Sequence, residues 1–64
     1  MCEATVYVAK DDGGQEVLLE DVDLVEFEDG DQVRLVSIFG DQLSLRARVR
    51  SMSLAAHRIL LERV

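Results

Sequence analysis

Hydrophobic and polar residues alternate along most of this chain, which is the pattern of β-strands with one buried face. The alternating segments are residues 2–8, 15–21, 33–39 and 43–51. In the second segment, Val17 and Leu19 fall on one face. The intervening clusters KDDGGQ, EDGDQ and FGDQ are typical of turns. The last segment, HRILLERV, suits a helix or a strand by composition. We predict a strand beginning near His57, because it would close an open sheet edge.

The segment DVDLVEFE changes phase in its middle. Val22 and Leu24 keep one phase, whereas Val25 and Phe27 take the opposite one. A shift of one residue predicts a β-bulge or a sharp bend at this point, which lets one strand pass between two halves of a curled sheet. The short strands, the Gly/Asp turns and the bend predict a single all-β domain over residues 1–64, a small SH3-like barrel of five to six short antiparallel strands.

Two of the predicted strands are apolar on both faces. In one, Val33, Leu35 and Phe39 oppose Val36 and Ile38; in the other, Ile59 and Leu61 oppose Leu60 and Val64. A domain of 64 residues is too small to cover both sets. The surplus therefore predicts a homodimer interface. The alternative is a local bulge that turns both sets inward.

The composition narrows the class of protein. One cysteine and one histidine are too few for an internal disulfide or a Cys/His zinc cluster. No stretch approaches the roughly 20 apolar residues of a membrane span. The start also lacks the basic and then apolar pattern of a signal peptide. We therefore predict a cytoplasmic protein without membrane contact, and a lone thiol agrees with a reducing compartment.

Charge is distributed unevenly. Residues 1–31 contain eleven of the thirteen acids, residues 32–64 contain six arginines, and the formal net charge is −6. This acidity argues against non-specific nucleic-acid binding. An RNA-binding barrel that uses a row of Arg46, Arg48 and Arg50 on one strand face is the alternative function. The simpler interpretation is that these arginines pair across strands with the acidic half.

Other functions have less support. The only aromatic residues are Tyr7, Phe27 and Phe39, and Phe27 and Phe39 are predicted to be core, which leaves few stacking platforms for RNA. Catalysis lacks a nucleophile, histidine and acid in one motif. The DDGGQ turn has acidic flanks that would repel phosphate. We therefore predict that the protein is not an enzyme.

The residue with the clearest chemical potential is Cys2, directly behind the initiator methionine. If Met1 is removed, the α-amine and thiolate of Cys2 close a five-membered chelate ring on one metal ion, and a neighbouring backbone amide adds a third donor. Mixed nitrogen and sulfur donors suit Ni(II), Cu or Zn, and planar coordination selects Ni(II) or Cu(II). One chain offers too few donors, whereas two chains on a two-fold axis bring two Cys2 residues together. The alternative, favoured on pattern alone, is a small hydrophobic cysteine. His57 alone is more often structural than a ligand.

The pieces MCEATVYV, LVSIFGDQ and HRILLE together resemble the CooT family, small nickel-binding proteins associated with maturation of carbon monoxide dehydrogenase. The similarity covers essentially the whole chain. It implies an SH3-like fold, a homodimer and Ni(II) binding through Cys2, and it makes metal binding the favoured role of this residue. It does not extend to His57, whose role stays open.

We therefore predict a nickel accessory protein, either a metallochaperone or a nickel store, that holds Ni(II) at the paired N-termini of a homodimer. Cys2 supplies its thiolate. Glu3 supplies its backbone nitrogen, and its side chain only modulates the local charge. The expected client is a nickel enzyme such as carbon monoxide dehydrogenase.

Overall fold

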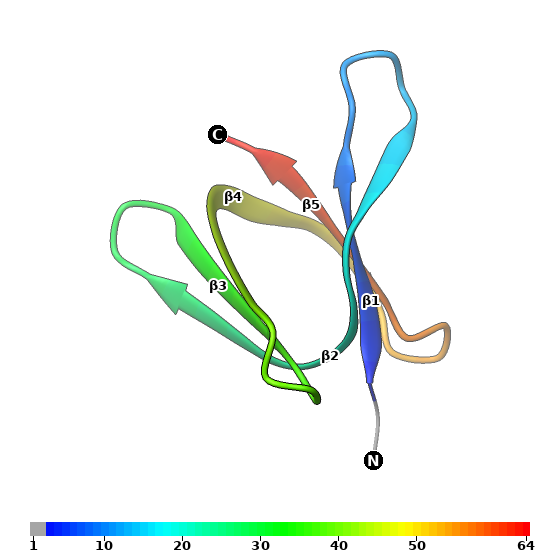
Figure 1. The fold of residues 1–64 in the computed structure, drawn as a ribbon. Coiled ribbons are helices and arrows are strands. Elements are labelled where there is room, and N and C mark those ends of the chain that lie inside the picture. The colour runs from blue at the N-terminus through cyan, green and yellow to red at the C-terminus, as the bar shows by residue number, and fades with distance from the viewer. Residues whose placement is uncertain (1–2) are drawn as a thin grey trace.

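Five strands form a closed barrel in the computed structural model, which describes residues 3–64 (Figure 1). The strands are β1 (Ala4–Ala9), β2 (Gln15–Glu28), β3 (Gln32–Ser37), β4 (Gln42–Ser53) and β5 (Arg58–Arg63). The small all-β barrel predicted from the alternation is confirmed, and the last segment is a strand that begins next to His57. Over the described part of the chain, no helix is long and apolar enough to cross a membrane.

The barrel closes through a parallel pair. Each strand pairs antiparallel with the next, but β1 and β5 run parallel, with Val6 opposite Ile59 and Val8 opposite Leu61. The predicted barrel of antiparallel strands is confirmed, with this one parallel pair at its seam. The reason is parity: five strands that alternate in direction leave the first and the fifth pointing the same way.

The strand β2 is long and bent. It runs without a break through the two segments that the alternation separated, and its first half pairs with β1 and its second half with β3. A register shift lies between Val22 and Leu24. This shift confirms the predicted bulge, because Val22 and Val25 can both face the core only if one extra residue lies between the two phases.

A second register shift in β2 corrects the sequence prediction. Val6 of β1 lies opposite Leu19, but Tyr7 lies opposite Val17, so Leu18 is an extra residue. Leu18 and Leu19 pack against the core, whereas Val17 is 48% exposed on the outer surface. Strict alternation placed Val17 and Leu19 on one face, and the shift between them separates the two.

The core lies inside the barrel and takes at least one residue from every strand. Its buried hydrophobic residues are Val6, Val8, Val22, Val33, Leu35, Ala47, Ile59 and Leu61. Phe27 and Phe39 are 62% and 74% exposed, so their assignment to the core was wrong. Phe27 lies near the end of β2. Phe39 lies beyond the end of β3, in the turn that Ser37 holds by accepting hydrogen bonds at Oγ from the N–H groups of Phe39 (3.1 Å) and Asp41 (3.2 Å).

The surplus apolar residues remain on the outside. Val36 and Leu60 are half-buried, while Ile38 and Val64 are 41% and 51% exposed. A bulge that turns both sets inward is therefore wrong. The homodimer that these residues predict stays a prediction.

The connections gather at two ends of the barrel (Figure 1). The start of β1, the β3–β4 turn and the β4–β5 turn lie toward the lower end of the view, whereas the β1–β2 hairpin and the C-terminus lie toward the upper end. Two backbone hydrogen bonds join segments at the lower end. The N–H of Ile38 donates to the carbonyl of Asp21, and the N–H of Thr5 donates to the carbonyl of His57, each at 2.9 Å.

Candidate metal site

The predicted metal ligands lie at the start of the chain, next to β1. Cys2 is outside the described residues. Glu3, which follows it, is described and is half-buried. Over residues 3–64, no group of three or more His, Cys, Asp or Glu side chains is placed to hold a metal ion. A site at this position would therefore depend on Cys2, on backbone nitrogen and on donors from a second chain.

Glu3 and His57 line the same hollow, which has a volume of about 250 Å³. Its walls are otherwise mainly apolar and include Met52, Leu54 and Ile59. Glu3, the second predicted site residue, thus lies near His57, the only histidine, and near exposed hydrophobic side chains. The sequence pattern left His57 unassigned, because residues distant along the chain become neighbours only when the barrel closes.

The position of His57 is set by the β4–β5 turn. Its N–H donates to the carbonyl of Leu54 at 3.3 Å. Its backbone φ is 55°, in the left-handed region that only glycine adopts without cost. His57 itself is exposed, and the β4–β5 turn is anchored to β1 through its carbonyl. Hydrogen bonds therefore hold the backbone of His57 in place, while its side chain stays exposed to solvent.

Exposed hydrophobic side chains accompany the hollow at the lower end of the barrel. Leu54 is 80% exposed, Phe39 is 74% exposed, Met52 is 51% exposed and Ile38 is 41% exposed. All four lie in or next to the β3–β4 and β4–β5 turns. Large apolar side chains clustered in this way favour contact with another protein surface over a solvated end.

The predicted arginine row lies on the outside of β4. Arg46, Arg48 and Arg50 are all exposed and alternate with inward-facing residues. Within residues 3–64, none of the three makes an ion pair, so their predicted pairing with the acidic half is wrong. The register explains this result, because Arg46 lies opposite Gln32 and only Arg48 has an acid, Glu62, as its cross-strand neighbour.

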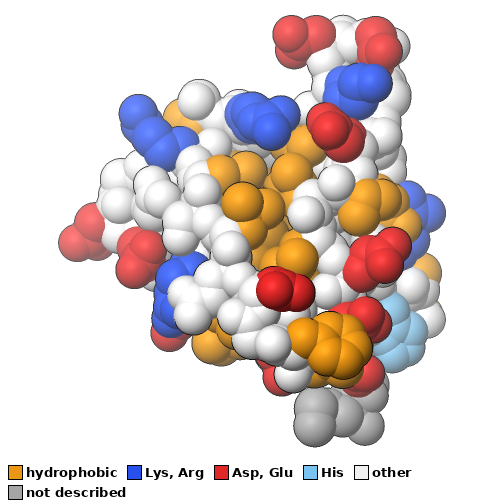
Figure 2. Space-filling model, viewed as in Figure 1, with side chains coloured by type: hydrophobic (Ala, Val, Ile, Leu, Met, Phe, Trp, Pro, Cys, Tyr) orange, Lys and Arg blue, Asp and Glu red, His pale blue; other side chains and the backbone are white. Residues whose placement is uncertain are grey.

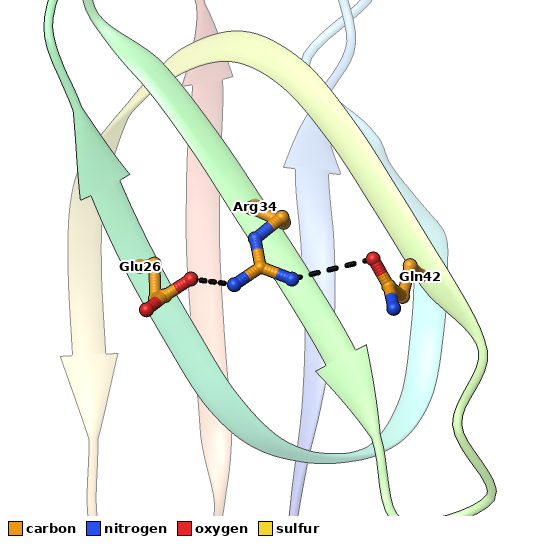
Figure 3. A network of polar contacts seen from close by, with 3 residues as sticks. All are labelled: Glu26, Arg34 and Gln42. Atoms are coloured by element: carbon orange, nitrogen blue, oxygen red, sulfur yellow. Dashed lines mark hydrogen bonds and ion pairs between the residues drawn. The ribbon is translucent and has the colours of Figure 1, made fainter.

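The arginine that pairs with the acidic half is Arg34 of β3 (Figure 3). Its Nη2 pairs with a carboxylate oxygen of Glu26 on β2, and its Nη1 donates to Oε1 of Gln42 on β4 at 3.3 Å. This arrangement joins three neighbouring strands on the outer surface. This contact was not predicted from the sequence, because the neighbours of Arg34 on the adjacent strands follow only from the register.

Comparison with known proteins places the chain in a family. The family model described as CO dehydrogenase accessory protein CooT matches residues 1–62. The chain belongs to the CooT family. The crystal structure of a protein described as a CooT from Carboxydothermus hydrogenoformans is similar, with a TM-score of 0.88, 35% sequence identity and coverage of 98% of each chain. Among curated proteins, none matches the chain.

The CooT match confirms the family predicted from the residues, and it covers the segment that contains Cys2 and Glu3. The family description is that of an accessory protein of carbon monoxide dehydrogenase, which is a supporting role and not the catalyst itself. This agrees with the prediction of a non-enzymatic protein that serves an enzyme.

Proposed function

We propose that this CooT-family protein is a cytoplasmic Ni(II)-binding accessory protein that holds the metal through Cys2 at the N-termini of a homodimer. The observation that carries the proposal is the family match across residues 1–62, which includes the terminal cysteine. It acts as a metallochaperone or as a nickel store, and its client is a nickel enzyme such as carbon monoxide dehydrogenase.

The donor chemistry at the start of the chain fits nickel. The Cys2 thiolate is a soft donor, and the backbone nitrogen of Glu3 is its nearest neighbour along the chain. Thiolate with nitrogen in a plane suits Ni(II). The Glu3 carboxylate adds negative charge near the cation without needing to bind it. Since one chain offers too few donors for four-coordination, the proposal requires the same set from a second chain.

The lower end of the barrel suits such a dimer. Leu54 and Phe39 are the most exposed large hydrophobic residues of the described chain, and both lie at the end where β1 begins. A two-fold contact there would cover both side chains and bring the two starts of β1 toward each other. The apolar hollow beside Glu3 offers space for a side chain of the second copy.

The test of the metal site is a Ni(II) titration of the purified protein, followed by ultraviolet absorption and native mass spectrometry. We expect thiolate-to-nickel bands that saturate at one metal per dimer and that disappear in Cys2→Ala. Glu3→Gln is the matched control, because it removes the neighbouring carboxylate charge and keeps the backbone nitrogen; it should retain the bands. Unchanged bands in Cys2→Ala would overturn the proposal.

The dimer has a separate test by sedimentation equilibrium. Leu54→Ser should weaken self-association, because it removes an exposed apolar side chain beside the hollow. Val17→Ser, on the first half of β2 and also exposed, should leave the association constant unchanged. A wild-type protein that stays monomeric with and without Ni(II), or equal effects of the two substitutions, would exclude the lower end as the interface.

A further inference from the structure

A groove runs along the outer surface of the barrel between the β1–β2 hairpin and strands β4 and β5. It consists of three adjoining hollows of about 320, 210 and 470 Å³. Gln15 and Leu60 line both the first and the second hollow, and Ala9, Lys10 and Arg50 line both the second and the third. We call this continuous depression the hairpin groove.

The floor and one wall of the hairpin groove are held in place by contacts between strands. Tyr7 and Leu60 lie opposite each other across the parallel β1–β5 pair, and both are half-buried. The Arg58 guanidinium lies 4.4 Å from the centre of the Tyr7 ring and donates to Oε1 of Gln15 at 3.0 Å. These contacts tie β5 to the hairpin strand, so the groove exists before any ligand arrives.

The charge of the hairpin groove opposes that of the whole chain. Four of the seven basic residues line it: Lys10, Arg50, Arg58 and Arg63. The acids in its walls are Asp11 and Glu62. Within residues 3–64, Arg50 and Arg63 make no ion pair. On the face shown in Figure 2, Lys and Arg side chains toward the upper end of the molecule lie beside Asp and Glu side chains.

The length of the groove suits an extended peptide. It follows β5 from Arg58 to Arg63, a strand of six residues. At a rise of about 3.3 Å per residue, this corresponds to roughly 20 Å, which an extended segment of about six residues would span. The cations in its walls and its apolar floor would meet the two faces of such a segment.

We propose that the hairpin groove binds an extended acidic segment of a partner protein. Carboxylates of the segment pair with Arg50, Arg58 and Arg63, while its apolar side chains lie on Leu60 and Ala9. Desolvation in the groove and the excess of cations favour carboxylates that are spaced along a strand. The first hollow of the groove shares Met52, Ser53, Arg58 and Ile59 with the hollow beside Glu3, so a segment that fills the whole groove would reach the lower end of the barrel.

Other occupants fit the groove less well. The two acids in its walls and the net charge of −6 repel carboxylates and phosphates alike, so charge alone does not separate a nucleic acid from an acidic peptide. Its one aromatic ring, Tyr7, is already covered by Arg58, so a base has no free platform. A second copy of this chain has its acids mainly in paired strands and turns, which do not supply a free extended segment.

Fluorescence anisotropy with a labelled eight-residue peptide of alternating Glu and Leu tests the proposal. The same peptide with Gln in place of Glu and an oligouridylate of eight nucleotides are the comparison probes. We expect saturable binding of the acidic peptide that weakens with salt. Arg50→Glu should reduce its affinity by about tenfold, whereas Arg46→Glu should change it by less than about twofold. Arg46 is the matched control, because it is an exposed arginine of the same strand outside the groove.

Each outcome bears on the proposal. Equal losses in Arg50→Glu and Arg46→Glu would show a response to net charge alone and overturn it. Tighter binding of the oligouridylate, lost in Arg50→Glu, would assign the groove to nucleic acid and overturn it as well. Absence of binding to every probe would also overturn it. If Arg50→Glu does not fold, Arg63→Glu replaces it, since Arg63 is exposed near the chain end and is expected to show the same loss.

Discussion

The carbonyl oxygen of His57 accepts a hydrogen bond from the N–H of Thr5, with 2.9 Å between oxygen and nitrogen. This bond joins the β4–β5 turn to the first strand at the position where the parallel β1–β5 pair begins, with Thr5 opposite Arg58. The barrel is thus closed beside the turn that places the only histidine. The conformation of His57 therefore influences both the seam of the fold and the end of the barrel where the metal site is proposed.

Substitutions of His57 should separate its backbone role from its side-chain role. Because φ is 55°, a β-branched residue at this position would be strained, and His57→Val should lower the free energy of unfolding by about 1–2 kcal/mol. His57→Gly should leave it unchanged within about 0.5 kcal/mol or raise it slightly, since glycine accepts the left-handed conformation but loses more chain entropy. Urea denaturation of both variants measures these values.

The same His57→Gly variant informs the metal site. It removes the imidazole from the hollow beside Glu3 and keeps the turn. If nickel affinity is unchanged, the histidine is a structural residue. A fall in nickel affinity without a fall in stability would instead place the imidazole among the ligands.

Core and surface leucines should differ sharply in their effect on stability. Leu35 is completely buried, and Leu35→Ala should destabilise the fold by about 2–5 kcal/mol through lost burial and a residual cavity. In a domain of this size, that loss approaches the whole stability. Leu35→Val, expected to cost about 1 kcal/mol, keeps the measurement possible. Leu54→Ala, at a position 80% exposed, should stay within about 0.5 kcal/mol in the monomer.

Chemical denaturation at low protein concentration measures these leucine effects without a contribution from self-association. A large loss in Leu54→Ala under those conditions would mean that the exposed leucine packs within its own chain. A small loss in Leu35→Ala would contradict the position of the core.

Much of the fold follows from the alternation, because a strand with one buried face imposes a period of two on the sequence. The change of phase between Val22 and Val25 was sufficient to locate the bend in β2. The shift at Leu18 left no comparable signal, since Leu18 and Leu19 are both apolar and either could have continued the phase. Phe27 and Phe39 were misplaced because alternation gives the direction of a side chain and not its distance from the barrel end.

The candidate site was predictable only in part. Cys2 and Glu3 stand out by their position in the sequence, whereas the hollow that joins Glu3 to His57 depends on closure between the first and last strands. The hairpin groove could not be predicted from the sequence for the same reason. Lys10 and Arg63 lie near opposite ends of the chain and line one hollow only because β1 and β5 are neighbours.

The Glu26–Arg34 ion pair should contribute little to stability. Its side chains are 44% and 31% exposed, so water screens the attraction, and a double-mutant cycle of Glu26→Gln and Arg34→Met should give a coupling free energy of about 0.5 kcal/mol, or at most 1 kcal/mol. The coupling should decrease between low and high salt. A coupling free energy above about 2 kcal/mol that does not change with salt would contradict this prediction, because it would require the pair to be shielded from water.

Nickel affinity should rise with pH, and the slope identifies the donor. The metal binds thiolate and unprotonated nitrogen, so protons must leave the Cys2 thiol, of pKa about 8.5, a free α-amine, of pKa about 7.7–8.0, and the backbone N–H of Glu3. Below these values, the apparent affinity should increase by about tenfold per pH unit for each proton released. A site built from donors that are already unprotonated at neutral pH would instead give an affinity that does not change with pH over this range. Competition titrations between pH 6 and 8.5 distinguish the two profiles. Cys2→Ala should remove the steep rise, and a wild-type profile that is already flat at pH 7 would exclude a thiolate as the main ligand.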